Sequence, residues 1–112
     1  MARAATTADA FNAVAEPRRR QILDVLVEGE RSVTDLVEVL PVSQPQVSKH
    51  LKVLKEVGLV RSRSVGRQRL YRLDAIALRP IHEWVKEYER HWSERLDRLD
   101  GYLDELQRKD QG

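Results

Sequence analysis

The segment Ser43–Val60, SQPQVSKHLKVLKEVGLV, combines positive charges with small hydrogen-bonding side chains. Its lysines are Lys49, Lys52 and Lys55, and hydroxyl and amide side chains precede them. Ammonium groups neutralise phosphates as point charges, whereas short hydroxyl and amide groups hydrogen-bond to the edges of bases. The residue types in this segment therefore predict recognition of a nucleic acid.

The positive charge of the chain is concentrated around this segment. The 112 residues carry a formal net charge of only +2, yet residues 43–73 hold 8 Lys and Arg against 1 Asp or Glu, a net charge of +7. The residues before 43 hold 5 against 7, and those after 73 hold 7 against 10. A local excess of this size attracts polyanions, above all nucleic acids.

The segment itself is expected to be a capped amphipathic helix that ends at Gly58. Ser43 and Gln46 have the spacing of a capping box at its start. Val47, Leu51 and Leu54 recur at helical spacing and predict the buried face. The residues expected on the opposite face are Gln44, Pro45, Ser48, Lys49, Lys52 and Lys55. His50 adjoins the buried face, so internal packing and a phosphate contact are equally good interpretations of it.

Three short helices are expected before this one, over residues 7–15, from Pro17 to near Gly29, and from Ser32 to Leu40, the last with Ser32 as its N-cap and Asp35 three residues on. At least one of Arg18–Arg20, at the start of the second helix, is expected to pair with a carboxylate. A basic hairpin is expected after the capped helix, with strands over residues 59–64 and 69–73. Gly66, in the connection over residues 65–68, supplies the positive φ that a tight turn needs.

A long final helix, begun or bent at Pro80, is expected to carry an apolar seam at heptad-like spacing from Ile81 to Leu106. An exposed seam of this length is unusual for a soluble monomer, so we expect a homodimer. Its dimerisation helices would span about residues 7–15 and 78–107. The expected interface residues are Phe11, Val14, Ile81, Trp84, Val85, Tyr88, Trp92, Leu96 and Leu99.

Together these elements predict a mainly α fold with a small β-hairpin, a single winged helix-turn-helix domain over residues 1–112, with its DNA-reading part at about 32–73. In that arrangement the capped helix enters the major groove of double-stranded DNA and the hairpin lies against the backbone or the minor groove. The expected DNA-binding residues are Gln44, Pro45, Gln46, Ser48, Lys49, Lys52, Arg63, Arg67 and Arg69.

The chain resembles the ArsR-type (ArsR/SmtB-like) winged-helix transcriptional regulators in three stretches, EPRRRQIL at 16–23, the segment 43–60 and GRQRLYRL at 66–73. The resemblance implies a repressor that binds an inverted-repeat operator as a homodimer. It places Gln44, Pro45, Ser48 and Lys49 at base-contacting positions and Arg67 at the tip of the wing.

The metal-ligand patterns of that family are missing, so the resemblance is to the branch without the usual metal sites. The family's Cys-x-Cys-Asp pattern is replaced by Ser32-Val-Thr34-Asp35, and the chain has no cysteine. Of the family's second, zinc-type pattern only Asp74 remains, because Ile76, Glu87 and Arg90 stand at the other ligand positions. We expect no metal and no cofactor.

Three other interpretations were weighed. An enzyme is not expected, because no nucleophile with an adjacent base and no phosphate-cradling glycine loop occurs. A winged-helix module that only contacts proteins would not need the net charge of +7. A metal-responsive repressor would need a non-standard site, such as one across the dimer with His82 or His91. The absence of cysteine and of an apolar span predicts a cytoplasmic location and no membrane contact.

Overall fold

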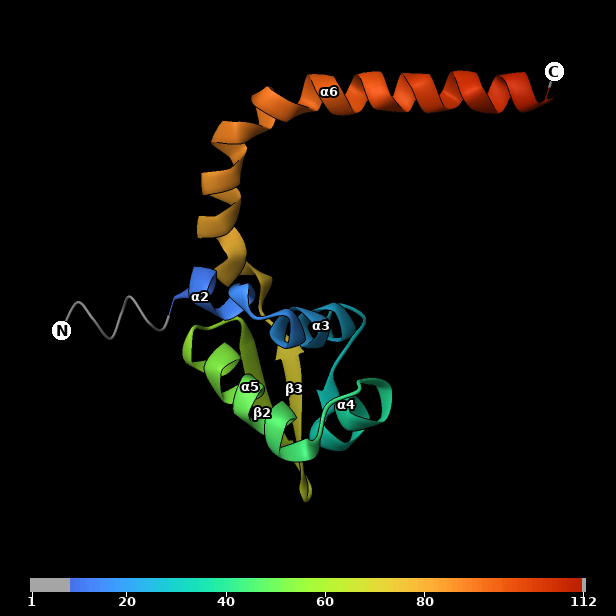
Figure 1. Cartoon of the computed structure of the whole chain (residues 1–112). Helices are drawn as coiled ribbons and strands as arrows, with labels where there is room; N and C mark the ends of the chain where they lie inside the picture. Colours follow the sequence, from blue (N-terminus) through green and yellow to red (C-terminus); the bar gives the residue numbers. More distant parts are fainter. Residues whose placement is uncertain (1–8, 112) are drawn as a thin grey trace. The chain divides into compact units, whose positions relative to one another are not determined.

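The computed structural model describes residues 9–111, with side chains described as far as residue 109. The helices are α2 (Ala10–Ala15), α3 (Pro17–Leu26), α4 (Val33–Val39), α5 (Gln44–Glu56) and α6 (Arg79–Gln111), with a short 3-10 helix η1 (Ala75–Leu78) before α6. The strands are β1 (Arg31–Ser32), β2 (Val60–Val65) and β3 (Gln68–Leu73) (Figure 1). The predicted mainly α class with a hairpin is confirmed. Residues 7 and 8 of the expected first helix lie outside the described residues.

The chain divides into two compact units, one ending at Pro80 and the other beginning at Ile81. In the first unit, α3, α4, α5 and β2 supply a shared apolar core. Its largest fully buried side chains are Ile22, Leu36, Val47, Leu51, Leu54, Leu59 and Val60. The predicted buried face of the capped helix is therefore confirmed, and this core fixes the orientation of α5.

The sheet is antiparallel with the strand order β1-β3-β2. Its hairpin differs slightly from the expectation, because Val65 pairs with Gln68 and only Gly66 and Arg67 remain in the loop. Gly66 has a φ of 61°, and no described residue other than glycine has a positive φ. A glycine first in a two-residue loop gives a turn whose twist matches that of the strands.

Strand β1 was not predicted. Its two residues pair with β3, Arg31 opposite Tyr71 and Ser32 opposite Leu70. Ser32 also caps α4, since its Oγ accepts from the backbone N–H of Asp35 at 3.1 Å while the Asp35 carboxylate accepts from the N–H of Ser32 at 3.1 Å. The same residue thus joins the sheet to the helices, and a strand this short has no alternating pattern to reveal it.

The arginines at the start of α3 bind backbone carbonyls where a carboxylate partner was expected. Arg19 donates from Nε to the carbonyl of Ala13 at 2.7 Å and from Nη2 to that of Asn12 at 3.1 Å, and Arg20 donates to the carbonyl of Val14. These carbonyls belong to the last turn of α2, where no intrahelical donor follows. The two guanidinium groups therefore cap α2 at its C-terminus.

The second unit consists of α6 from Ile81 onward, a single long helix. Ile81 is half-buried, and the other predicted seam residues in this helix are exposed, among them Trp84 at 54%, Tyr88 at 52% and Leu99 at 51%. Trp84 and Tyr88 stack edge to face with ring centroids 5.7 Å apart. Within residues 9–111, no helix is both long enough and apolar enough to cross a membrane.

Candidate nucleic-acid interface

The start of α5 is held in one geometry by a reciprocal cap. Ser43 Oγ accepts from the backbone N–H of Gln46 at 3.4 Å, and Gln46 Oε1 accepts from the N–H of Ser43 at 3.4 Å. Gln46 therefore keeps its amide N–H groups and the second lone pair of Oε1 for a ligand. The positive end of the helix dipole lies at this exposed end of α5, which favours an anionic partner.

The polar face of α5 is open. Gln44, Pro45, Ser48, Lys49 and Lys52 are all exposed, as the sequence predicts, whereas Val47 and Leu51 on the other face are 0% and 1% exposed. Among residues 9–111, none of the three lysines of α5 has an ion-pair partner. Their ammonium groups are available to a polyanion.

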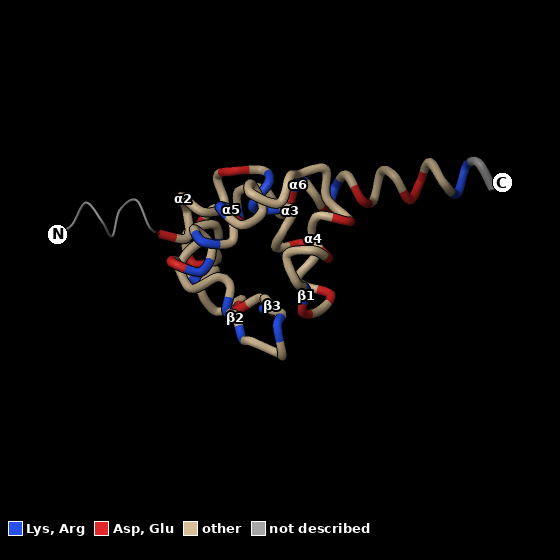
Figure 2. Tube along the Cα trace, turned by 90° about the horizontal axis from the view of Figure 1, so that it is seen from below, with Lys and Arg blue, Asp and Glu red and all other residues tan. Residues whose placement is uncertain are grey.

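The arginines of the hairpin separate onto its two sides. In the β2–β3 register, Arg61 lies opposite Arg72 and Arg63 opposite Leu70, which places the three arginines on one side. Arg69 lies on the other side, where its Nη1 donates to Ser62 Oγ at 3.3 Å. Arg67 is in the exposed loop at the tip. Figure 2 shows the Lys and Arg positions along α5 and the hairpin in blue.

Two of the hairpin arginines are already paired with carboxylates. Arg63 forms a two-pronged contact with Glu30, at 2.9 Å from Nε to Oε2 and 2.7 Å from Nη2 to Oε1, and Arg61 pairs with Asp74. The hydrogen bond from Arg63 lowers the pKa of Glu30, and that from Arg61 lowers the pKa of Asp74. Both carboxylates are consequently ionised at neutral pH.

These pairs change the charge expected from the sequence. Counting Glu30 and Asp74 with residues 43–73 reduces the net charge of +7 to +5. Among the described residues, the cations without a carboxylate partner are then the lysines of α5, Arg67 at the tip, Arg69 beside it, and Arg72 on β3. Sequence inspection missed Glu30, since it lies 33 residues from Arg63 and no local pattern joins the two.

His50 belongs to the interior side of α5. Its Nδ1 is buried and has no hydrogen-bond partner among the described residues. Burial lowers the pKa of His50, and Arg19 lowers it further, with smaller contributions from Lys49 and Arg18, while Glu16 opposes the shift. This environment favours the packing interpretation over a phosphate contact.

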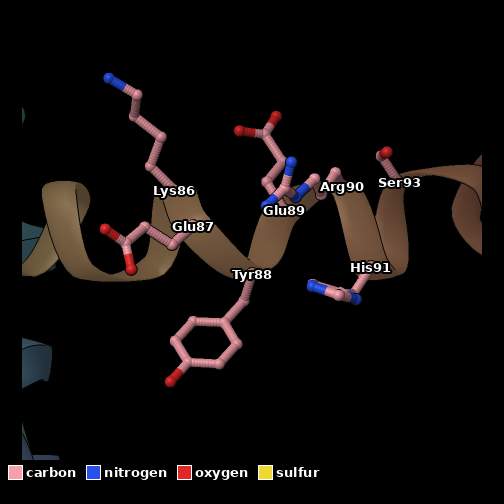
Figure 3. Close-up of a pocket in the computed structure, with 7 residues that line it drawn as sticks. All are labelled: Lys86, Glu87, Tyr88, Glu89, Arg90, His91 and Ser93. Carbon is pink, nitrogen blue, oxygen red and sulfur yellow. The ribbon is translucent and has the colours of Figure 1, made fainter.

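Among the described residues, no group of three or more His, Cys, Asp or Glu side chains is placed to hold a metal ion. A surface hollow lies on α6 and is lined by Lys86, Glu87, Tyr88, Glu89, Arg90, His91 and Ser93. Figure 3 shows Tyr88 and His91 projecting from the same side of the helix. His91 thus adjoins the apolar seam, and the hollow is a shallow feature of one helix.

Known proteins resemble the chain in sequence and in structure. The sequence pattern described as "Bacterial regulatory protein, arsR family" matches residues 16–62. The HTH-type transcriptional regulator Rv2034 of Mycobacterium tuberculosis is 40% identical over 87 residues, 78% of each chain. The transcriptional repressor SdpR of Bacillus subtilis is 32% identical over 75 residues, 67% of this chain and 83% of that one. The solved structure of an ArsR-like transcriptional regulator from Rhodococcus sp. RHA1 is 30% identical, covers 88% of this chain and 91% of its own, and has a TM-score of 0.68.

Proposed function

This chain belongs to the ArsR family of bacterial DNA-binding transcriptional regulators, and we propose that it is a repressor that binds an inverted-repeat operator as a homodimer. The observation that carries the proposal is the open face of α5. Within the part of the chain that the structure describes, its lysines have no ion-pair partner, its start is capped and its apolar face is anchored in the core. A regulator of this kind acts in the cytoplasm, where its operator lies.

In the proposed complex, α5 lies in the major groove, which is about 12 Å wide and admits a helix. Gln44, Pro45, Ser48 and Lys49 are near the start of α5 and meet base edges. Gln46 contributes its amide N–H groups and the one lone pair of its oxygen that the cap does not use. Lys52 lies further along the helix and reaches the phosphate backbone, as does Arg67 at the tip of the wing.

The homodimer is supported by the exposed seam of α6, which a second copy of the chain would cover. Ile81, Val85 and Leu96 continue the seam, and Phe11 and Val14 on α2 are proposed as further residues of the dimer interface. Two copies related by a two-fold axis would read half-sites whose centres lie roughly 34–36 Å apart or a multiple of that distance. Sedimentation that shows a stable monomer at micromolar concentration would exclude the dimer.

The decisive experiment is footprinting on the DNA upstream of the protein's own gene, followed by binding of alanine variants to the footprinted site and to random duplex. Ser48→Ala and Lys49→Ala should each cost about 1–3 kcal/mol on the operator and much less on random DNA. Lys52→Ala and Arg67→Ala should weaken binding to both. Each of these two changes should reduce the magnitude of the negative slope of log K against log salt by about 0.9.

Two rival functions have their own tests. A winged-helix module that contacts only proteins would show no salt-dependent retention of random duplex in a filter-binding assay. A metal-responsive repressor with a non-standard site would bind zinc stoichiometrically and lose operator affinity when it did. The open basic face favours DNA binding over the first rival, and the replaced ligand positions at Ser32, Thr34 and Ile76 favour a regulator that does not respond to metal.

A further inference from the structure

We propose that Glu30 and Asp74 are positioning residues that withhold Arg63 and Arg61 from DNA, so that these two arginines of the wing contribute no phosphate contacts. This inference rests on the proposed function, because it concerns how many phosphates the wing neutralises. The sequence presents the hairpin arginines as one basic group. The inference separates them into closed arginines, Arg61 and Arg63, which a carboxylate pairs with, and open arginines, which remain available to a phosphate.

The pair between Arg63 and Glu30 occupies the donors that a phosphate would use. Arg63 donates from Nε and Nη2 to the two carboxylate oxygens of Glu30, at 2.9 and 2.7 Å. An arginine binds a phosphate through the same bidentate geometry. The Glu30 side chain is only 28% exposed, against 60% for Arg63. Glu30 also directly precedes β1, so the sheet holds its backbone in place.

Asp74 repeats the arrangement at the other end of the hairpin. Its carboxylate pairs with Arg61, and Arg72 lies close enough to lower the pKa of both Asp74 and Glu30. Three guanidinium groups and two carboxylates thus share this side of the wing, with a net charge of +1. Arg67 at the tip and Arg69 on the opposite side have no carboxylate partner within the described part of the chain.

A DNA phosphate that bound Arg61 or Arg63 would have to displace a carboxylate and then remain beside its negative charge. Exposed ion pairs are individually weak, so the pairs could exchange if nothing opposed the incoming anion. The displaced carboxylate does oppose it, because two like charges about 4 Å apart repel even in a solvent-rich setting. The closed arginines therefore limit the affinity for any duplex, whatever its sequence.

The test is the salt dependence of binding to a random-sequence duplex by the full-length protein. Glu30→Gln should release Arg63 and add one phosphate contact. The slope of log K against log salt should then increase in magnitude by about 0.9, and binding should be about 8-fold tighter at 0.1 M salt. Asp74→Asn should act in the same way through Arg61, and it serves as the second variant if Glu30→Gln does not fold.

Two controls separate a released contact from a change in net charge. Glu28→Gln removes the same charge from an exposed neighbour and should leave the slope unchanged. The double variant Glu30→Gln/Arg63→Gln should return to the wild-type slope. An unchanged slope in both Glu30→Gln and Asp74→Asn, or an equal increase in Glu28→Gln, would overturn this inference alone. A wild-type protein without salt-dependent binding would remove the proposed function, and this inference with it.

Discussion

Helices α5 and α6 are both amphipathic, but they leave different sides open. In α5 the apolar residues Val47, Leu51 and Leu54 are at most 1% exposed, and only the polar face remains available. In α6 the apolar residues are exposed together with the charged ones, as Trp84 at 54% and Leu99 at 51% illustrate. An amphipathic pattern alone therefore does not identify a binding surface. The binding surface is identified by the side of the helix that the fold leaves exposed.

The charges of the two helices favour different partners. Residues 44–56 hold 3 Lys against 1 Glu, whereas residues 79–111 hold 7 Lys and Arg against 9 Asp and Glu. A basic open face suits a polyanion. A mixed face with a small negative excess does not attract DNA, but it is compatible with a second copy of the same helix around an apolar seam.

The largest effect, on the free energy of unfolding, is expected from truncating a buried apolar side chain of α5. Leu51 is 1% exposed, so Leu51→Ala leaves a cavity and should lower the free energy of unfolding by about 2–5 kcal/mol in urea denaturation. Ile76→Ala, at a side chain that is 68% exposed in the same unit, should change it by less than about 0.5 kcal/mol. Equal losses in the two variants would contradict the assignment of Leu51 to the core.

A charge in the seam of α6 should act on association. Leu99→Asp would place an unpaired carboxylate in the proposed dimer interface, and the dimer dissociation constant should increase about 100-fold, or about 3 kcal/mol, in analytical ultracentrifugation. Arg108→Gln changes the charge of α6 by the same amount at an exposed position on the side of the helix away from the seam, and should change the constant less than about threefold. If both variants dissociated alike, general repulsion would explain the effect.

The cap of α5 should contribute less. Ser43→Ala removes the hydroxyl that accepts from Gln46 and should cost about 1 kcal/mol of stability in thermal or urea unfolding. Operator affinity should fall with it, because the base-contacting turn frays, while the salt slope stays the same. Ser64→Ala on β2 makes the same chemical change at an exposed position and should alter neither quantity.

The smallest effect is expected from pH. Since the folded state lowers the pKa of His50 below its ordinary value of 6.5, the unfolded chain binds the proton more readily. The stability of the wild-type protein should therefore be constant above pH 6.5 with respect to this group and decline as the pH falls below it. In urea denaturation over the same pH range, the free energy of unfolding of His50→Gln should decline less steeply than that of the wild-type protein. If the two proteins gave the same dependence of this free energy on pH, His50 would not contribute to it.

Local patterns in the sequence predicted the elements that local chemistry defines. The capping boxes of Ser43 with Gln46 and of Ser32 with Asp35 are present, since each needs only a spacing of three residues. The tight turn at Gly66 is also present, because glycine adopts the positive φ of 61° that the turn requires without a steric penalty. The apolar face of α5 follows from its helical period.

Contacts between distant residues could not be predicted in this way. The pairing of Glu30 with Arg63 depends on the three-stranded sheet, which itself depends on a two-residue strand without a period of its own. The carbonyl contacts of Arg19 and Arg20 depend on the bend between α2 and α3, which turns the guanidinium groups back toward the preceding helix. Residue type alone suggested carboxylate partners for these arginines.

The arginine caps on α2 have a consequence for local unfolding. Six residues are too few for a helix that is stable by itself, since isolated helices shorter than about 12–15 residues are marginal in water. The side chain of Asp9 holds the first turn through the N–H of Asn12, and Arg19 and Arg20 hold the last. The stability of α2 is thus set largely by side chains of α3. In hydrogen exchange the amides of the two helices should open as one cooperative unit, although Glu16 separates them in the sequence.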